Sequence, residues 1–493
     1  MGAAREGAAL SLSAPGTGWL NLSRLRDDGP MPAPYPHDFR PQASTVDRAR
    51  LDVLMHEELE RFRAEHPRSA ALHDRARRSL VGGVPMPWMM RWAGGFPIVA
   101  ERAEGNRVVD VDGHAYVDLC LGDTGAMTGH SPPAVTAALR ERLGQGLTMM
   151  LPTEDAAWVG EELARRFDLA KWLFTLSATD ANRTALRIAR QITGRPRVLV
   201  FSYCYHGSVD EAFAIADGDG RTRSRAGNVG PAVDPAQTTR AVEFNDLEAL
   251  ERALAPGDVA CVLAEPAMTN MGIVLPDADY HAGLREITRR HATLLVLDET
   301  HTISVSPAGA TGLWGLEPDL LTIGKTIGAG VPSGALGLSE DVASAMLADT
   351  EADYEDTGGV GGTLAGNALS LAAMRVTLDA VLTEHSYAHA VPLAARFADG
   401  VRKTAAAHAL AWNVTQLGCR AEYRFQPEPA RNGTEAHAAA DPDLERYLHL
   451  HALNRGVLLT PFHNMALMAP TTTEHDVDRH TEVFGEAVAM LKG

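Results

Sequence analysis

The chain has 493 residues, of which 45% are hydrophobic and 22% charged, so it is long enough for two globular domains. Its 45 basic and 63 acidic residues give a formal net charge of -18, which disfavours binding to phosphate backbones and to anionic membrane surfaces. We therefore expect neither nucleic acid nor membrane as a partner. No apolar run approaches the length of a membrane span, and no basic segment precedes an apolar one near the start, so a cytoplasmic location is predicted.

Cysteine and lysine usage narrows the chemistry. The four cysteines are scattered singly without C-x-x-C spacing, which favours reduced, buried thiols over disulfides or a thiolate zinc site. The later histidines lack the carboxylates and the helical spacing of zinc sites, and no metal is predicted. Only four of the 45 basic residues are lysines, at positions 171, 325, 403 and 492. A reaction that needs an amine therefore has few side chains to choose from.

The predicted elements begin after residues 1–45, a segment rich in Gly, Pro, Ala and Ser that predicts a mobile arm or a strap laid on another subunit. From residue 45 to about residue 80, apolar residues spaced three and four apart predict a helix. The segment RVVDVDGHAYVDL then predicts a hairpin, because two alternating runs flank Asp-Gly.

Beyond the hairpin, helical stretches alternate with six short apolar runs: WLFTLS, RVLVFSY, VACVLAEP, TLLVLDE, LLTIGK and ALGLS. Runs of this kind predict strands that are buried on both faces of a largely parallel α/β sheet. A second mixture of helices and strands follows residue 380. We therefore predict an N-terminal arm over 1–45, a large domain over 116–380, and a smaller domain built from 46–115 and 381–493.

Two polar side chains stand where apolar strands end, and ligands of open α/β sheets bind beyond the carboxyl ends of the strands. Asp298 ends LLVLD, where it could simply cap a turn, and Lys325 follows LLTIG, where it could be a solvated loop lysine. Lys325, however, lies between an apolar strand and the glycine-rich GKTIGAGVPSGA, and a lysine desolvated there would lose its proton readily and attack aldehydes. A carboxylate in the place of Asp298 suits a pyridine nitrogen, which it keeps protonated.

The segment SATDANRTALRIARQ offers a place for a phosphate, because small residues with free N–H groups lead from a strand into a helix. By itself, such a Ser-Ala-Thr is more often an ordinary helix cap. The order in which this segment, Asp298 and Lys325 follow one another favours a shared site.

Nine segments, in family order, resemble the class III (fold-type I) aminotransferases, nearest the glutamate-1-semialdehyde 2,1-aminomutase subgroup. They are RSLVGGVPMP, DVDGHAYVDL, GHSPPAV, FTLSATDANRTALRIAR, YHG, EPAMTNMGIVLP, LLVLDETHT, DLLTIGKTIGAGVPSGA and GGTLAGN. The resemblance covers about residues 75–490. It implies the pyridoxal-phosphate (PLP) transferase fold of type I, an α/β fold in which a large cofactor-binding domain surrounds a mostly parallel seven-stranded sheet and a smaller α+β domain is attached. It also implies a homodimer with shared active sites.

The resemblance assigns the cofactor contacts position by position. Lys325 would form the Schiff base with PLP and then shuttle the proton, and Asp298 would pair with the pyridine nitrogen; these two are the predicted catalytic residues. Tyr205 would stack on one face of the cofactor ring, and Thr363 would reach the phosphate across the subunit boundary. The other predicted cofactor-binding residues are Ser177, Ala178 and Thr179 in the phosphate loop, His206 and Thr300 beside the ring, and Glu265 near the phenolic edge.

Two departures from the family pattern concern the cofactor. The phosphate loop reads S-A-T-D instead of S-G-T-E, which keeps the N–H donors and adds the methyl group of Ala178. Thr300 replaces an aliphatic residue on the second face of the ring, where its hydroxyl could bond the phenolic oxygen or merely match the volume.

Two further departures concern the substrate. The arginine that holds the substrate acid in the aminomutase is replaced by Met89 in an ungapped match, and Arg91 fits only after a shift of two residues. Near the C-terminus, Met465 stands where the family has a glutamate. Both changes favour a large apolar pocket, predicted to be lined by Trp88, Met89, Met150 and Met465, although methionines in loops more often fill a core. The carboxylate of a small acid would bind a guanidinium, either Arg420, our first choice, or Arg91 or Arg424, unless these are surface arginines.

These patterns favour an aminotransferase that moves an amino group from a bulky or aromatic amine or β-amino acid donor to a keto acid acceptor such as pyruvate or 2-oxoglutarate. The reaction would be ping-pong, through pyridoxamine phosphate. An aminomutase or racemase of the same fold, which needs no second substrate, is the alternative. A PLP-binding protein without catalysis is a third hypothesis, and the combination of Lys325, Asp298, Tyr205 and Thr363 argues against it.

Overall fold

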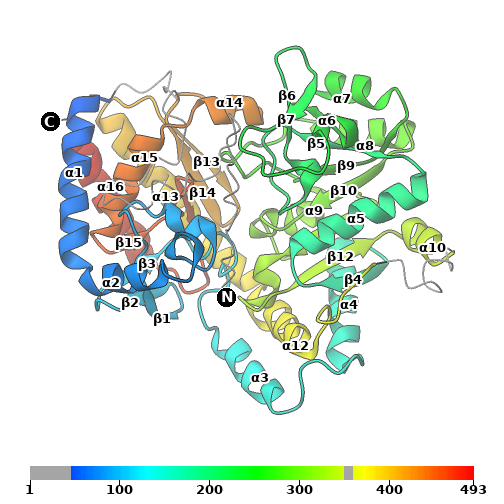
Figure 1. Cartoon of the computed structure of the whole chain (residues 1–493), viewed down its shortest axis with the longest axis horizontal. Helices are drawn as coiled ribbons and strands as arrows, with labels where there is room; N and C mark the ends of the chain where they lie inside the picture. Colours follow the sequence, from blue (N-terminus) through cyan, green and yellow to red (C-terminus); the bar gives the residue numbers. More distant parts are fainter. Residues whose placement is uncertain (1–45, 349–358, 493) are drawn as a thin grey trace, which may run out of the picture.

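The computed structural model describes residues 46–348 and 359–492, so the predicted arm over 1–45 lies outside the described residues. Figure 1 shows two units side by side, one built around a large sheet and one built mainly from α1, α13, α15 and α16. None of the described helices is both long and apolar enough to cross a membrane.

The large sheet has seven strands in the order β4-β12-β11-β10-β9-β5-β8. β12 is antiparallel to both of its neighbours, and the other neighbouring strands are parallel. Six of these strands coincide with the six apolar runs, which confirms the predicted fold class; β8 is the one that the runs missed. The strand bounds are β4 Lys171–Thr175, β5 Arg197–Phe201, β8 Thr239–Val242, β9 Val259–Ala264, β10 Leu294–Asp298, β11 Leu320–Gly324 and β12 Gly334–Leu338.

The helices of this unit pack around the sheet, as Figure 1 shows. α5 crosses β9, β11 and β12, while α8 lies against β10 and α4 against β4. Every residue of β9 and of β11 is buried, which explains their unbroken apolar sequences. The helix bounds are α3 Pro133–Leu143, α4 Glu154–Phe167, α5 Ala178–Thr193, α6 Pro235–Thr238, α7 Leu247–Leu254, α8 Tyr280–Arg290, α9 Gly309–Trp314, α10 Glu340–Ala348 and α12 Ala368–Val376. A short hairpin, β6 Ala214–Ala216 with β7 Thr222–Ser224, lies beside the sheet.

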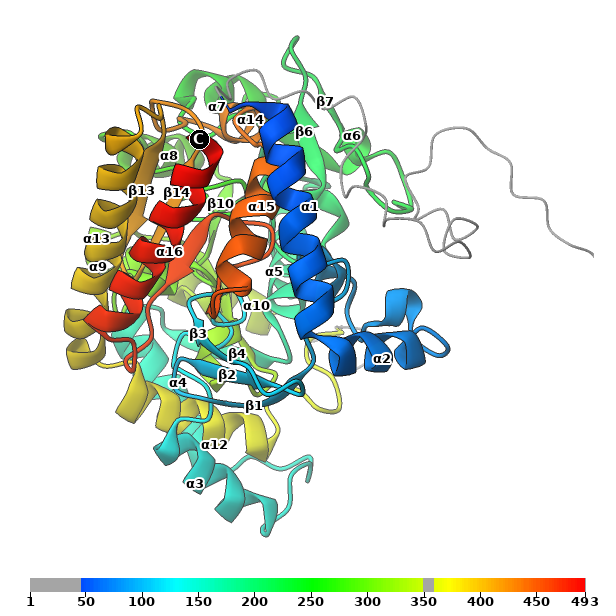
Figure 2. The same ribbon diagram turned by 90° about the vertical axis from the view of Figure 1, so that its left-hand side faces the viewer.

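The second unit combines the beginning and the end of the described chain. In Figure 2, α1, α15, α16 and α13 lie beside one another, and α13 packs on the sheet β13-β14-β16. The helix bounds are α1 Arg48–Glu65, α2 Pro67–Ala76, α13 Glu384–Ala407, α14 Gly433–Ala438, α15 Pro442–Leu453 and α16 Glu474–Lys492. The strand bounds are β13 Asn413–Leu417, β14 Arg420–Arg424 and β16 Met465–Leu467.

The predicted hairpin is present and joins this second unit. β2, Arg107–Asp110, pairs antiparallel with β3, Ala115–Asp118, and β3 pairs in parallel with β15, Val457–Leu458. β1, Ala100–Glu104, completes the four-stranded sheet. The domain boundaries over 46–115, 116–380 and 381–493 stay a prediction.

The predicted N-terminal helix is two helices. α1 ends at Glu65 and α2 begins with Pro67, whose ring cannot continue a preceding helix but fits the first position of a new one.

Candidate active site

Lys325 follows the last residue of β11 and opens a short 3₁₀ turn with a backbone φ of 51°. Its Nζ lies 2.9 Å from both the backbone oxygen and Oδ2 of Asp123, and 2.6 Å from Nε2 of His301. The prediction that this amine has apolar surroundings is therefore wrong. β11 itself is apolar, but the Lys325 side chain extends beyond the end of the strand to the polar loop that contains Asp123.

Asp123, which the sequence analysis did not single out, lies in a tightly wound loop after β3. Four consecutive residues there, Leu121 to Thr124, have φ values between 45° and 80°, a region that residues other than glycine rarely adopt. This conformation turns the Asp123 backbone oxygen and carboxylate toward the same amine. The local sequence LGDTG contains two glycines and gives no sign of such a contact.

Arg420 and His301 complete the polar cluster around Lys325. Arg420, at the start of β14, has a side chain that is only 1% exposed. Its Nη1 donates to Nδ1 of His301 over 3.1 Å, and its Nη2 donates to Oγ1 of Thr124 over 3.2 Å. The second unit thus contacts His301, the neighbour of Lys325, through one buried guanidinium.

Asp298 ends β10 and is fixed by three donors. Nδ1 of His206 and Nδ2 of Asn182 bond its Oδ2 at 2.9 and 2.8 Å, and the Thr300 N–H bonds its Oδ1 at 3.0 Å. Burial opposes ionisation of this carboxyl, but the hydrogen bond and the charge of His206, with the bonds from Thr300 and Asn182, outweigh it and lower the pKa of Asp298. An ionised, oriented carboxylate therefore stands at the strand end, with its position set partly by Asn182, which the sequence analysis missed.

The predicted phosphate loop leads from β4 into α5. Ser177 caps the helix, since its Oγ accepts from the Asp180 N–H over 3.2 Å. The N–H groups of Ala178 and Thr179 open the helix, where backbone donors have no intrahelical acceptor. A Cβ at Gly324 would lie 2.8 Å from the Ala178 nitrogen. The glycine before Lys325 thus lets the start of α5 approach the strand end closely.

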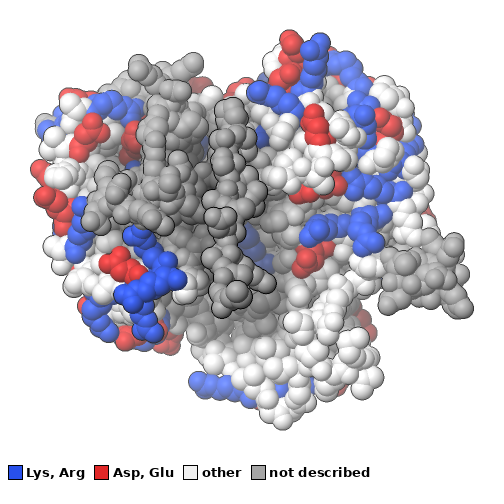
Figure 3. Space-filling view, in the orientation of Figure 1, with Lys and Arg blue, Asp and Glu red and all other residues white. Residues whose placement is uncertain are grey.

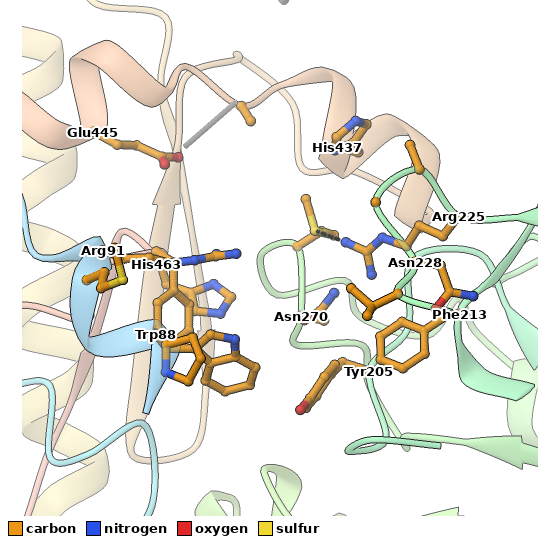
Figure 4. Close-up of a pocket in the computed structure, with 18 of the residues that line it drawn as sticks. Trp88, Arg91, Tyr205, Phe213, Arg225, Asn228, Asn270, His437, Glu445 and His463 are labelled. Atoms are coloured by element: carbon orange, nitrogen blue, oxygen red, sulfur yellow. Dashed lines mark hydrogen bonds between the residues drawn. The ribbon is translucent and has the colours of Figure 1, made fainter. Parts of the chain in front are cut away.

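Tyr205 and Trp88 face a cavity of about 760 Å³ between the two units. Their ring centroids are 5.3 Å apart, and Trp88 also meets Phe462 at 5.4 Å. Figure 4 shows Trp88, Arg91 and His463 on one side of the cavity, with Tyr205 opposite them. The Arg91 guanidinium lies 5.5 Å from the centre of the Phe462 ring.

The predicted substrate residues separate into two groups. Trp88 and Arg91 line the cavity, together with Met90, whereas Met89 does not and is 38% exposed. These residues belong to one short turn, Pro87–Arg91, and the place that the prediction gave to Met89 in the cavity wall is taken by Met90. Met465 is buried, with its Sδ 2.9 Å from Nη2 of Arg420.

Three other predicted residues, Met150, Thr363 and Glu265, do not belong to the polar cluster around Lys325. Met150 is 77% exposed, and Thr363 is exposed on the loop before α12. Neither lines the cavity of its own chain. Glu265, at the end of β9, is buried, and burial raises its pKa to about 7 against the hydrogen bond from Thr269. Arg424, the remaining arginine candidate, also lines the cavity.

Orphaned polar atoms at this site fit the expected cofactor. Nε2 of His206 and Oγ1 of Thr300 are buried and have no hydrogen-bond partner among the described residues. A pyridine ring between Tyr205 and Thr300 would place its nitrogen toward Asp298, its aldehyde toward Lys325 and its phosphate toward Ala178 and Thr179. The donors and the charges that PLP needs are present, so the residues fit this cofactor.

Three comparisons with known proteins agree with this geometry. A family model described as aminotransferase class-III matches residues 88–488. The glutamate-1-semialdehyde 2,1-aminomutase of Anaeromyxobacter sp. (strain Fw109-5) is 33% identical over 417 residues, which are 83% of this chain and 95% of that protein.

Among solved structures, a glutamate-1-semialdehyde-aminomutase from Pseudomonas aeruginosa PAO1 is 50% identical, with a TM-score of 0.88 over 91% of this chain and 100% of that one. A beta-phenylalanine aminotransferase from Variovorax paradoxus is 27% identical, with a TM-score of 0.78 over 89% of this chain and 97% of that one. The extent of these matches and the placement of Lys325 and Asp298 lead to one conclusion: the chain belongs to the class III aminotransferase family.

Proposed function

We propose that this chain is an aminomutase, which moves an amino group between neighbouring carbons of one carboxylate-bearing molecule. The new amino group is attached to one carbon before the original amino group leaves the neighbouring carbon. The molecule is therefore a diamine part-way through the reaction. Such a molecule has a second ammonium beside the nitrogen that is being exchanged. The carboxylate of Asp123, 2.9 Å from Nζ of Lys325, is the observation that carries the proposal, because it would hold this second ammonium.

PLP is the cofactor, and when bound it supplies an aldehyde that takes up and returns amino groups and a ring that withdraws electrons. The Lys325 amine would hold the aldehyde and afterwards move the proton at the substrate carbon. Asp298 would keep the ring nitrogen protonated, and the first N–H groups of α5 would bind the phosphate. Tyr205 would cover one face of the ring and keep water from the reacting atoms.

Two arginines would hold the substrate carboxylate. The sequence has Met89 where the family has an early arginine, but Arg91, two residues further along the chain, lines the cavity. Arg420 offers a second guanidinium, beside His301, which in turn contacts Lys325. The curated relative and the 50% identical structure both have the aminomutase name, which supports the same reaction.

The decisive experiment gives the holoenzyme glutamate 1-semialdehyde and no keto acid, and follows the product by NMR. An aminomutase should complete many turnovers with this single substrate. Lys325→Ala should abolish turnover, while Lys171→Ala, which changes an exposed lysine, should leave it unchanged. Absence of multiple turnovers with this and other vicinal amino aldehydes would overturn the proposal.

The role of Asp123 has its own measurement. Asp123→Asn should bind the second ammonium less firmly and release more diamine into solution, which mass spectrometry detects. Asp279→Asn, at an exposed position, is the matched control and should release no more than the wild type. Unchanged diamine release in Asp123→Asn would contradict this role.

A transaminase acting on a bulky amine is the second candidate. The cavity of about 760 Å³, with Trp88, Tyr205 and Phe462 in its walls, is large enough for a drug-sized aromatic molecule. The same incubation separates the two reactions. A transaminase given one amine and no acceptor stops after one equivalent per site, and turnover resumes when pyruvate or 2-oxoglutarate is added.

We also propose that two copies of the chain form a homodimer. The lower lobe formed by α3, α4 and α12 is largely uncharged on the face seen in Figure 3. The loop with Met150 lies beside the loop with Thr363, since the Ala368 N–H donates to the Leu147 oxygen over 2.9 Å. Several exposed apolar side chains belong to this region: Leu143, Met149, Met150, Leu151 and Leu364. A second copy would cover them, and would receive Thr363 and Met150 in its own active site.

A further inference from the structure

A chain of hydrogen bonds joins the buried guanidinium of Arg420 to the amine of Lys325. Arg420 Nη1 lies 3.1 Å from Nδ1 of His301, and His301 Nε2 lies 2.6 Å from Nζ of Lys325. Nζ lies 2.9 Å from the Asp123 backbone oxygen and 2.9 Å from Asp123 Oδ2. His301 thus has one neighbour on each ring nitrogen, Arg420 on Nδ1 and Lys325 on Nε2. The contact with Arg420 decides which ring nitrogen has the proton, and therefore whether Nζ of Lys325 donates or accepts.

The guanidinium allows only one arrangement of the imidazole. Arginine has N–H donors and no acceptor, so Nδ1 of His301 must accept, and it therefore has no proton. Burial is the largest cause that holds the pKa of His301 well below its usual range, so the ring is neutral without help from a charge on Lys325. A neutral imidazole without a proton on Nδ1 has its proton on Nε2. The other charged groups near the ring are Lys325, Asp123 and the more distant Asp298.

The Nε2–H of His301 therefore points at Nζ, which has to accept it. An ammonium has three hydrogens and no lone pair, so it cannot accept a hydrogen bond. A neutral amine accepts one bond and donates two, and Nζ has one donor, His301, and two acceptors, both on Asp123. Both hydrogens and the lone pair of the neutral Nζ then take part in one hydrogen bond each. The opposite assignment would place an Nδ1–H of His301 against the Arg420 N–H.

We infer that His301, held by Arg420 in its Nε2–H form, presents Lys325 as a neutral amine. His301 is a positioning residue, since it acts through Lys325. A neutral amine is the form that attacks an aldehyde, whereas a lysine paired only with Asp123 would keep its proton. The inference does not depend on the proposed function, because an aminomutase and a transaminase both need this amine.

The test measures how fast each lysine reacts with trace acetic anhydride at several pH values between 6 and 8, in the full chain freed of cofactor. Peptide mass spectrometry reads each site, and the exposed Lys171, Lys403 and Lys492 are internal references. Acylation of an ordinary ammonium rises about tenfold per pH unit in this range, because only the neutral fraction reacts. We expect acylation of Lys325 to change less than about twofold per unit, whatever its accessibility.

Variants assign this behaviour to His301. His301→Leu removes the donor, and acylation of Lys325 should then rise with pH in parallel with the references. His301→Gln can offer an N–H to Nζ and an oxygen to Arg420, and it should restore the flat profile. His475→Leu, at an exposed histidine, is the matched control and should stay flat. If the Leu variant does not fold, His301→Asn, whose shorter amide cannot reach Nζ, replaces it.

Two results would overturn the inference. In the first, Lys325 of the wild type is acylated in parallel with the three references, and in the second, the profile stays flat after His301 loses its donor. Neither result bears on turnover, so failure here is distinguishable from failure of the proposed reaction.

Discussion

The carboxylate of Asp298 is held by an imidazole, a side-chain amide and a backbone N–H. The ring nitrogen of the cofactor would be a further partner of this carboxylate. Because the negative charge acts only on the bound ring, its loss should affect the reaction more than the binding of the cofactor, whose phosphate contacts lie on α5.

We therefore predict that Asp298→Asn retains PLP but loses about 10²- to 10³-fold in kcat, the usual cost of removing one preorganised electrostatic contact. Absorbance of the bound cofactor and steady-state turnover measure the two effects. Asp168→Asn, at an exposed left-handed position that asparagine tolerates, is the control. Wild-type turnover in Asp298→Asn would contradict the assigned role.

Sequence reasoning singled out the polar candidates that stand at strand ends. Lys325 and Asp298 follow buried apolar runs, and such a boundary is visible in one segment of sequence. Asp123 was not found, because its contact with Lys325 joins positions 202 residues apart and its loop has no periodic pattern. The His301–Arg420 contact, across 119 residues, could not be predicted for the same reason.

At the scale of elements, α5 is positioned by glycines of its neighbours. Gly207 follows Tyr205 and His206, and its φ is 79°. A Cβ there would lie 1.9 Å from Oγ1 of Thr179, which accepts the Ser208 N–H over 3.3 Å. The turn after β5 and the first turn of α5 therefore meet only because this residue has no side chain.

We predict that Gly207→Ala weakens binding of PLP at least tenfold, because the clash moves the start of α5 away from the phosphate. Gly220→Ala is a matched control, since Gly220 has a φ of 73° but open space around its Cβ position. Titration of each cofactor-free variant with PLP gives the dissociation constants. Equal affinities in the two variants would contradict this account.

The elements themselves were predicted where burial is uniform. Five of the six predicted strands of the large sheet have continuous apolar sequences because both of their faces are covered, whereas β4, at the edge of the sheet, is only half-buried. β8 has the sequence TRAV, with Arg240 paired to Asp258. Because it contains a charged residue, β8 lacks the continuous apolar sequence that predicts a buried strand. The break between α1 and α2 was also missed, although Pro67 marks it.

For the whole molecule, the proposed homodimer predicts that two inactive variants restore one another. Lys325→Ala removes the amine of its own site, and Thr363→Asp places a negative charge beside the partner's phosphate. Refolded together, they should regain up to about a quarter of wild-type activity, because half of the dimers are mixed and each has one intact site. A mixture of Lys325→Ala and Asp298→Ala should gain nothing. No recovery with Thr363→Asp would contradict the shared site.

The buried histidines of the second unit predict how stability depends on pH. Burial lowers the pKa of His480 to about 3 from the 6.5 of a free histidine. Between these values the unfolded chain binds a proton that the folded chain rejects, so stability is present above pH 6.5 and is lost as the pH falls toward 3, by about 1 kcal/mol per unit. His480→Leu should lose less stability than wild type or the exposed-site control His475→Leu between pH 6.5 and 4 in urea unfolding. Parallel losses would contradict this account.

The small number of lysines limits how many side chains of the protein can react with its own aldehyde cofactor and substrate. PLP and the proposed substrate are aldehydes, which attack any accessible primary amine and leave side chains modified. Of the four lysines only Lys171, Lys403 and Lys492 are exposed, and the other 41 basic side chains are guanidinium groups, which are far poorer nucleophiles toward carbonyls. The surface therefore offers only three lysine amines to free cofactor and substrate, while the half-buried Lys325 is the lysine amine at the proposed binding site.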